Sequence, residues 1–88
     1  MFLEMKPGLW LSRYWIERIT VIQVVEHKHE EGTFLVRIYF EAQGQQSQGQ
    51  YLSLYQNTPS WSAAQTKAAF LVRELDRFVQ GEEVVLVK

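Results

Sequence analysis

The chain has no cysteine, only two prolines and no long apolar run among its 88 residues. Without cysteine there is no disulfide framework, so packing or self-association has to stabilise so small a domain. The absence of cysteine also fits a reducing compartment. No apolar segment approaches the roughly 20 residues that span a bilayer. The N-terminal sequence MFLEMKPG contains a glutamate and a proline where a signal peptide would need a basic, then continuously apolar stretch. We therefore expect one cytoplasmic domain over residues 1–88, with no membrane partner.

The chain also lacks an excess of charge. Nine Lys and Arg against ten Asp and Glu leave a net charge of −1, and the basic residues are spread along the sequence. No polybasic segment is present to hold phosphates by counterion release. This balance disfavours nucleic acid as a partner.

No motif of enzyme chemistry is recognisable. The glycines are isolated, no serine or threonine lies in the context of an activated nucleophile, and we expect the acidic residues in turns, at chain ends or on the outer face of a helix. General acid–base catalysis needs a carboxyl or histidine in a cleft. We therefore predict a non-enzymatic protein, with no catalytic residue and no cofactor.

The two histidines fall in the sequence EHKHEE. On a strand, His27 and His29 would face the same side, with Glu31 as a possible third ligand. Charged residues are also what a solvated hairpin tip usually contains, and a zinc site normally needs three or four ligands. We expect a turn here and no metal.

What is present is a pattern of strands followed by one helix. The β-branched residues from 16 to 28 predict a strand, and residues 34–42 alternate with Phe34, Val36, Ile38, Phe40 and Ala42 on one face. Gly32 marks the turn between them, the polar residues 43–50 predict a hairpin loop, and residues 51–56 predict a third strand. Pro7-Gly8 indicates a turn, and residues 9–15 an extended lead-in or a short strand.

The helix follows the third strand. Apolar residues at helical spacing form one stripe: Trp61, Ala64, Ala68, Leu71, Val72, Leu75, Phe78 and Val79. Thr58 before Pro59 offers an N-cap, Ser62 with Gln65 a competing capping box, and Gly81 a helix end. Residues 83–87 predict a final strand.

These elements predict an α+β fold: a three-stranded antiparallel β-meander, one amphipathic α-helix packed on one sheet face, and a short C-terminal strand (β-β-β-α-β). A right-handed crossover would place the last strand beside the first, in the order 3-2-1-4. One face of the sheet is then left open.

The open face is the main candidate for function. The alternation predicts that Leu35, Arg37, Tyr39, Tyr51 and Tyr55 cluster there, with Arg18 or Thr20 alongside. Tyrosine and arginine are enriched at protein interfaces. The same residues could stack single-stranded bases.

A second candidate lies on the helix. Phe70 falls away from the apolar stripe, beside Arg73 and Arg77, where it could dock on another chain. We therefore predict an interaction module, most simply a homodimer joined through the open face or the terminal strand and serving as an accessory or regulatory protein. The alternatives are a single-stranded nucleic-acid binder and, third, an enzyme or ligand-binding protein with a site between helix and sheet or between subunits.

Overall fold

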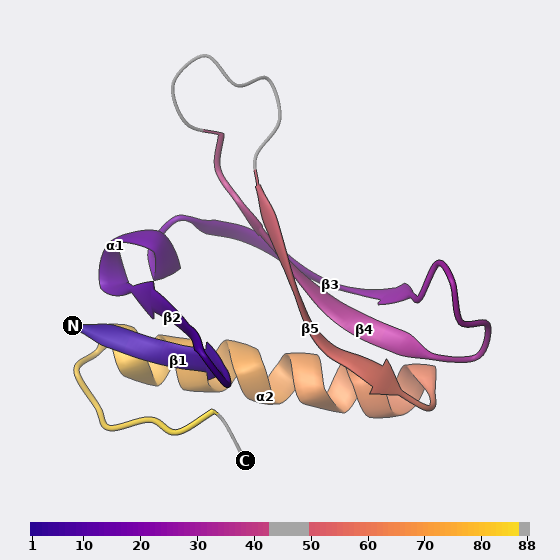
Figure 1. Cartoon of the computed structure of the whole chain (residues 1–88). Coiled ribbons are helices and arrows are strands. Elements are labelled where there is room, and N and C mark those ends of the chain that lie inside the picture. The colour runs from indigo at the N-terminus through magenta and orange to yellow at the C-terminus, as the bar shows by residue number, and fades with distance from the viewer. Residues whose placement is uncertain (43–49, 87–88) are drawn as a thin grey trace.

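The computed structural model describes residues 1–42 and 50–86 and shows an α+β fold (Figure 1). Its elements, in chain order, are β1 (Phe2–Lys6), β2 (Leu9–Ser12), α1 (Arg13–Ile16), β3 (Ile19–Glu26), β4 (Phe34–Phe40), β5 (Tyr51–Thr58) and α2 (Trp61–Val79). The loop predicted over residues 43–50 lies outside the described residues except for Gln50.

The predicted antiparallel meander is confirmed. β3, β4 and β5 form one three-stranded sheet in that order, with Gln23 opposite Arg37 and Ile38 opposite Leu52. The alternation of β4 is as expected, because Val36, Ile38 and Phe40 are all buried toward the core. The turn before β4 contains Gly32 at a φ of +82°, a conformation that glycine adopts without a steric cost.

The N-terminal residues form a hairpin, of which the turn at Gly8 and the short strand after it were predicted but the first strand was not. Gly8 turns the chain with a φ of +81°, and β1 pairs with β2 in a separate two-stranded sheet. The extended lead-in ends at Ser12, whose hydroxyl accepts a hydrogen bond from the N–H of Trp15 at 3.4 Å and starts the one-turn helix α1. The strand predicted from residue 16 therefore begins only at Ile19.

Helix α2 is confirmed, but its N-cap is neither of the two predicted residues. Ser60 caps it by accepting the N–H of Ala63 at 3.1 Å, while the Thr58 hydroxyl donates to the Tyr55 carbonyl at 2.8 Å. The helix ends as predicted around Gly81, at a φ of +87°. The N–H groups of Gly81 and Glu82 donate to the carbonyls of Phe78 and Arg77, which is a Schellman motif.

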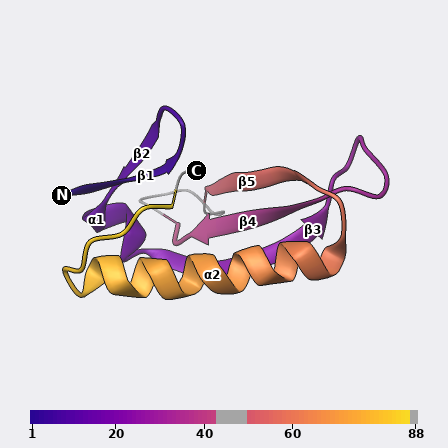
Figure 2. The ribbon, with the colours of Figure 1, turned by 90° about the horizontal axis from the view of Figure 1, so that it is seen from below.

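The core lies between one face of the three-stranded sheet and a layer made of α2, the β1–β2 hairpin and the C-terminal segment (Figure 2). Five residues of the predicted stripe are buried: Ala64, Ala68, Leu71, Leu75 and Phe78. Trp61 and Val72 are exposed instead, because they lie on the edge of the stripe.

The predicted C-terminal strand is wrong, and so is the four-stranded order. Residues 83–86 form no strand, and the segment runs back beside α2 toward the hairpin (Figures 1 and 2). Leu86 is 3% exposed and belongs to the core cluster together with Leu3 and Met5 of β1. The apolar C-terminal segment thus packs between α2 and the β1–β2 hairpin.

Candidate interaction surfaces

Three of the predicted residues do meet on the sheet face opposite α2. Tyr39 and Tyr51 are cross-strand partners with ring centroids 5.8 Å apart. The guanidinium carbon of Arg37 lies 4.4 Å from the centroid of the Tyr51 ring, and its Nη1 donates to the Tyr39 hydroxyl at 3.4 Å. We call Arg37, Tyr39 and Tyr51 the Arg37 cluster. It combines a cation with two aromatic rings.

The Arg37 cluster has unused hydrogen-bonding capacity. The Nε of Arg37 is buried and has no hydrogen-bond partner among the described residues. Tyr51, in contrast, is 58% exposed, so one side of the cluster is open to a partner. Thr20 was predicted to lie beside the cluster and does, since its hydroxyl donates to the Tyr39 carbonyl at 3.3 Å. Arg18 was the other predicted neighbour, but its guanidinium stacks 3.6 Å over the Tyr14 ring instead.

Leu35 and Tyr55 are not part of this cluster. Leu35 is only 5% exposed. Between the pairs Val36–Leu54 and Phe34–Thr58 the register shifts, so that residues 55–57 of β5 lie opposite Leu35 alone. This bulge breaks the alternation of the strand. At a φ of +56°, Tyr55 turns toward the helix and packs against the core.

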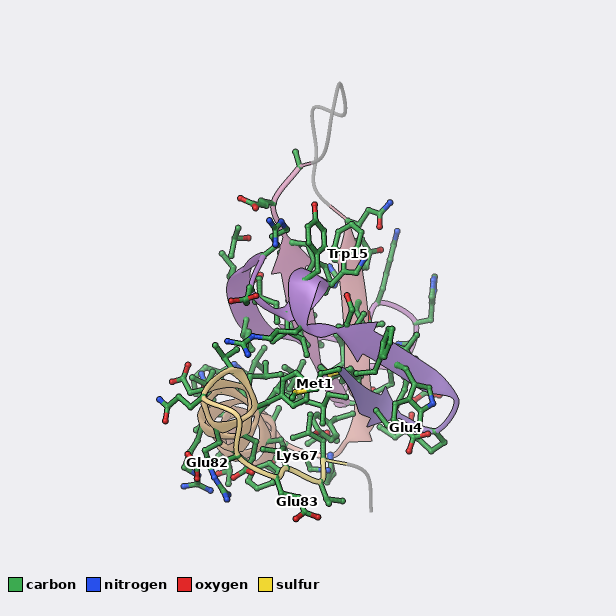
Figure 3. The ribbon with its side chains drawn as sticks, turned by 90° about the vertical axis from the view of Figure 1, so that its left-hand side faces the viewer. Met1, Glu4, Trp15, Lys67, Glu82 and Glu83 are labelled. Carbon is green, nitrogen blue, oxygen red and sulfur yellow. The ribbon has the colours of Figure 1, made fainter. Side chains whose placement is uncertain are left out.

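The displaced Tyr55 forms one wall of a groove along α2. The groove has a volume of about 470 Å³, and we call it the Tyr55 groove. Its lining consists of Tyr55 from β5, Leu86 from the C-terminal segment, and the helix residues Thr66, Lys67, Ala69, Phe70 and Arg73. Figure 3 shows Lys67 projecting between the end-on helix and the C-terminal segment.

The charges of the Tyr55 groove are all positive. The ammonium of Lys67 lies 5.1 Å from the Tyr55 ring centroid, and the guanidinium carbon of Arg73 lies 5.6 Å from that of Phe70. Both are at the range where a cation is attracted to a ring face. Burial raises the pKa of Tyr55 above its ordinary value, so the phenol is neutral at physiological pH.

The predicted helix patch of Phe70, Arg73 and Arg77 is only partly an open surface. Phe70 is half-buried against the core. Arg77 is engaged in ion pairs with Glu82 at 3.3 Å and Glu74 at 3.1 Å. The hydrogen bond to Glu82 and the charge of Glu74 both raise the pKa of Arg77.

Glu74 itself corrects the expectation that all acidic residues are solvated. It is 6% exposed and interacts with Arg73 at 3.7 Å as well as with Arg77. Such a carboxylate needs partners because an uncompensated buried charge is costly. Helical spacing is the signal that could have found it, because Glu74 is one turn from the buried Leu71 and Phe78, whereas the exposed Asp76 is one turn from Val72 and Val79 at the edge of the stripe.

A third surface is the outer edge of β3, which has no partner strand in the part of the chain described here. Next to it lies an apolar groove of about 170 Å³ between β3 and α2. Its lining is Ile16, Ile19, Ile22, Val72, Leu75, Asp76 and Val79. The sequence predicted that the C-terminal strand would cover this side of the sheet and form the edge, so the open edge of β3 was not expected.

The histidines form a turn, as expected. The Nδ1 of His27 accepts the backbone N–H of His29 at 3.2 Å, and the two rings are 6.3 Å apart. Over residues 1–42 and 50–86, no group of three or more His, Asp or Glu is placed to hold a metal ion.

Comparisons with family models, curated proteins and solved structures found no match to this chain. None of the helices within the described ranges is long and apolar enough to cross a membrane.

Proposed function

We propose that this protein is a non-enzymatic interaction module that works as a homodimer, in which β3 pairs antiparallel with β3 of a second copy. The observation that carries the proposal is the free edge of β3. Unpaired strand edges are templates for pairing with another chain, and proteins that stay monomeric usually interrupt or charge them. β3 reads ITVIQVVE, with no proline and a single charged residue at its end.

The backbone of β3 offers a regular set of groups for such pairing. The N–H of His27 donates to the Thr33 carbonyl, which marks a hydrogen-bonded pair toward β4. Because these pairs alternate in an antiparallel ladder, the N–H and C=O groups of Ile22, Val24 and Glu26 point away from β4. A second copy related by a twofold axis would satisfy them in both chains.

The apolar groove beside β3 supplies contact area that strand pairing alone lacks. Val72 is 45% exposed and Val79 is half-buried, both on the flank of α2 next to β3. In an edge-to-edge dimer the two α2 helices lie on the same side of a joined sheet, so these valines face their counterparts. Stable interfaces bury about 1,200–2,000 Å² in total, which requires such a helix contact in addition to the strands.

The test is the mass in solution and its response to a charge on this flank. Light scattering after gel filtration should give twice the 10.4 kDa of one chain for the wild type. Val72→Glu should give a monomer, because it places two carboxylates opposite each other in an apolar contact. Val85→Glu is the matched control, since Val85 is 68% exposed and lines a different groove, together with Phe2 and Trp10 of the β1–β2 hairpin.

The wild type remaining monomeric at millimolar concentration would refute the dimer. So would a dimer that persists in Val72→Glu while circular dichroism shows the fold intact. If Val85→Glu dissociates the dimer and Val72→Glu does not, the interface lies at the C-terminal segment and not at β3.

A second candidate function is single-stranded nucleic-acid binding through the Arg37 cluster. It is favoured by the stacking of Arg37 on Tyr51 beside Tyr39, a cation–aromatic arrangement suited to unpaired bases. The net charge of −1 argues against it. Submicromolar binding of an oligonucleotide that weakens with salt, and weakens further in Tyr39→Ala and Tyr51→Ala by about 1–3 kcal/mol per lost stack, would place it first.

A further inference from the structure

We infer that the Tyr55 groove is a binding site for a small amphipathic carboxylate, a ligand with a flat apolar body and one acidic group. This inference is independent of the proposed dimer. The groove lies on the flank of α2 that faces β5 and the C-terminal segment, whereas the dimer contact lies on the flank that faces β3.

The groove is apolar where the body of the ligand would lie. Tyr55 and Phe70 provide two aromatic walls, and Leu86 and Ala69 complete the lining. Its volume of about 470 Å³ falls in the range of about 300–1,000 Å³ that is typical of small-molecule sites. Ligand sites of this kind have mostly apolar walls and a few polar groups that fix orientation.

The charge of the groove selects an acid. Among the described residues, the charged members of the lining are Lys67 and Arg73, and both are cations. Lys67 makes no ion pair with a carboxylate of the described residues. Its ammonium lies over the face of the Tyr55 ring. Arg73 keeps a solvent-exposed guanidinium, with Glu74 at 3.7 Å as its ion-pair partner. On a chain of net charge −1, Lys67 is therefore a cation without a carboxylate partner among the described residues, beside an Arg73 that is paired with Glu74.

The backbone of Tyr55 is a second, independent observation. A φ of +56° is the left-handed region, which is unfavourable for a residue other than glycine or asparagine. The bulge that imposes it turns the Tyr55 ring away from the open sheet face and into the groove wall. Strain of this kind is concentrated at ligand sites, where it positions a side chain.

The dimensions favour a small molecule over a peptide. The helix residues that line the groove run from Thr66 to Arg73, so at 1.5 Å per residue they span about 10 Å. This length accommodates one aromatic or short aliphatic body with its carboxylate. It would hold only about three residues of an extended chain at about 3.3 Å each, and the bulge interrupts the β5 edge that contributes Tyr55 to the lining.

Phenylpropionate is a suitable probe, and phenylpropanol is its neutral counterpart. We expect the full-length protein to bind phenylpropionate with a dissociation constant on the order of 0.1–1 mM by calorimetry, in the range of efficient small ligands. The amide NMR signals of Ala69 and Phe70 should shift on binding. Lys67→Gln should weaken binding of the acid about tenfold, since a charge-assisted hydrogen bond is lost. Binding of the alcohol should not change in that variant.

Lys28→Gln is the matched control, because it removes the same charge from the exposed turn before β4. It should leave the affinity within twofold, as should Val72→Glu, which separates this site from the dimer. The inference is overturned if the acid and the alcohol bind equally, or if Lys28→Gln weakens the acid as much as Lys67→Gln.

Discussion

The two edges of the three-stranded sheet are built in opposite ways. β5 is interrupted by a bulge at residues 55–57, contains a strained Tyr55, and is followed by Pro59. The Nζ of Lys6 also donates to its Ser53 carbonyl at 3.5 Å. β3 has none of these features along its central residues, although it also shifts register near Ile19. One edge is therefore protected against pairing and the other is not.

This difference indicates where each edge acts. The β5 bulge both blocks strand addition and directs Tyr55 toward the helix, so one local irregularity gives a protected edge and a groove wall. The regular β3 edge keeps its outward backbone groups available. We therefore expect mutations in β5 to affect folding and the groove, and mutations in β3 to affect association.

The largest expected effect is on β5. Leu54 is 1% exposed in the core, so Leu54→Ala should lower the free energy of unfolding by about 2–5 kcal/mol through lost burial and a cavity. Urea denaturation would measure this, and the loss should not depend on protein concentration. Ser53→Ala, one residue away on the other face, is the control and should change stability by less than about 1 kcal/mol. A small effect of Leu54→Ala would mean that β5 is not the edge strand that stabilises the fold.

The sequence predicts the meander and helix well because their patterns are periodic and local. The alternation of β4 and the spacing of the α2 stripe follow from side-chain geometry within single elements. The positions of Arg37, Tyr39 and Tyr51 were predictable for the same reason. Tyr55 was misplaced because alternation holds only while a strand is regular, and nothing in YLSLYQNT marks the bulge.

The other misplacements concern contacts between distant segments. Residues 83–86 are apolar and suit a strand, but whether they pair or pack depends on whether a space beside α2 is open to them. The β1–β2 hairpin, 70 or more residues earlier in the chain, creates that space, and Leu86 fills it. The free edge at β3 is likewise a consequence of the assembled fold, which no window of the sequence contains.

A smaller effect is expected from removing one outward hydrogen-bond donor of β3. Val24→Pro deletes an N–H that points away from β4, so the fold should remain while the dimer weakens. Two symmetry-related hydrogen bonds of about 0.5–1.5 kcal/mol each would be lost, which raises the dissociation constant roughly 5- to 150-fold. Analytical ultracentrifugation would measure this change.

Gln23→Pro is the counterpart one residue earlier. The N–H of Gln23 points toward β4, so proline there breaks the ladder within the chain and should unfold the domain. If both variants are folded dimers, the partner does not pair through β3. Val24 also packs against the core, so the assignment of inward and outward groups is wrong if Val24→Pro unfolds the isolated chain while Val24→Ala leaves it folded.

The smallest expected effect is a pH dependence at Tyr55. Burial raises the pKa of this phenol above its ordinary value of about 10, because the ionised form is poorly solvated in the groove wall. The contribution to stability is fully present below about pH 10. Above that pH the unfolded chain loses this proton first, so the free energy of unfolding falls as pH rises toward the folded pKa, by at most about 1.4 kcal/mol per pH unit.

Tyr55→Phe should reduce this slope in urea denaturation between about pH 9 and 11, whereas Tyr51→Phe, at an exposed position, should keep it. Equal slopes in all three proteins would mean that the Tyr55 hydroxyl is solvated and does not form part of the groove wall.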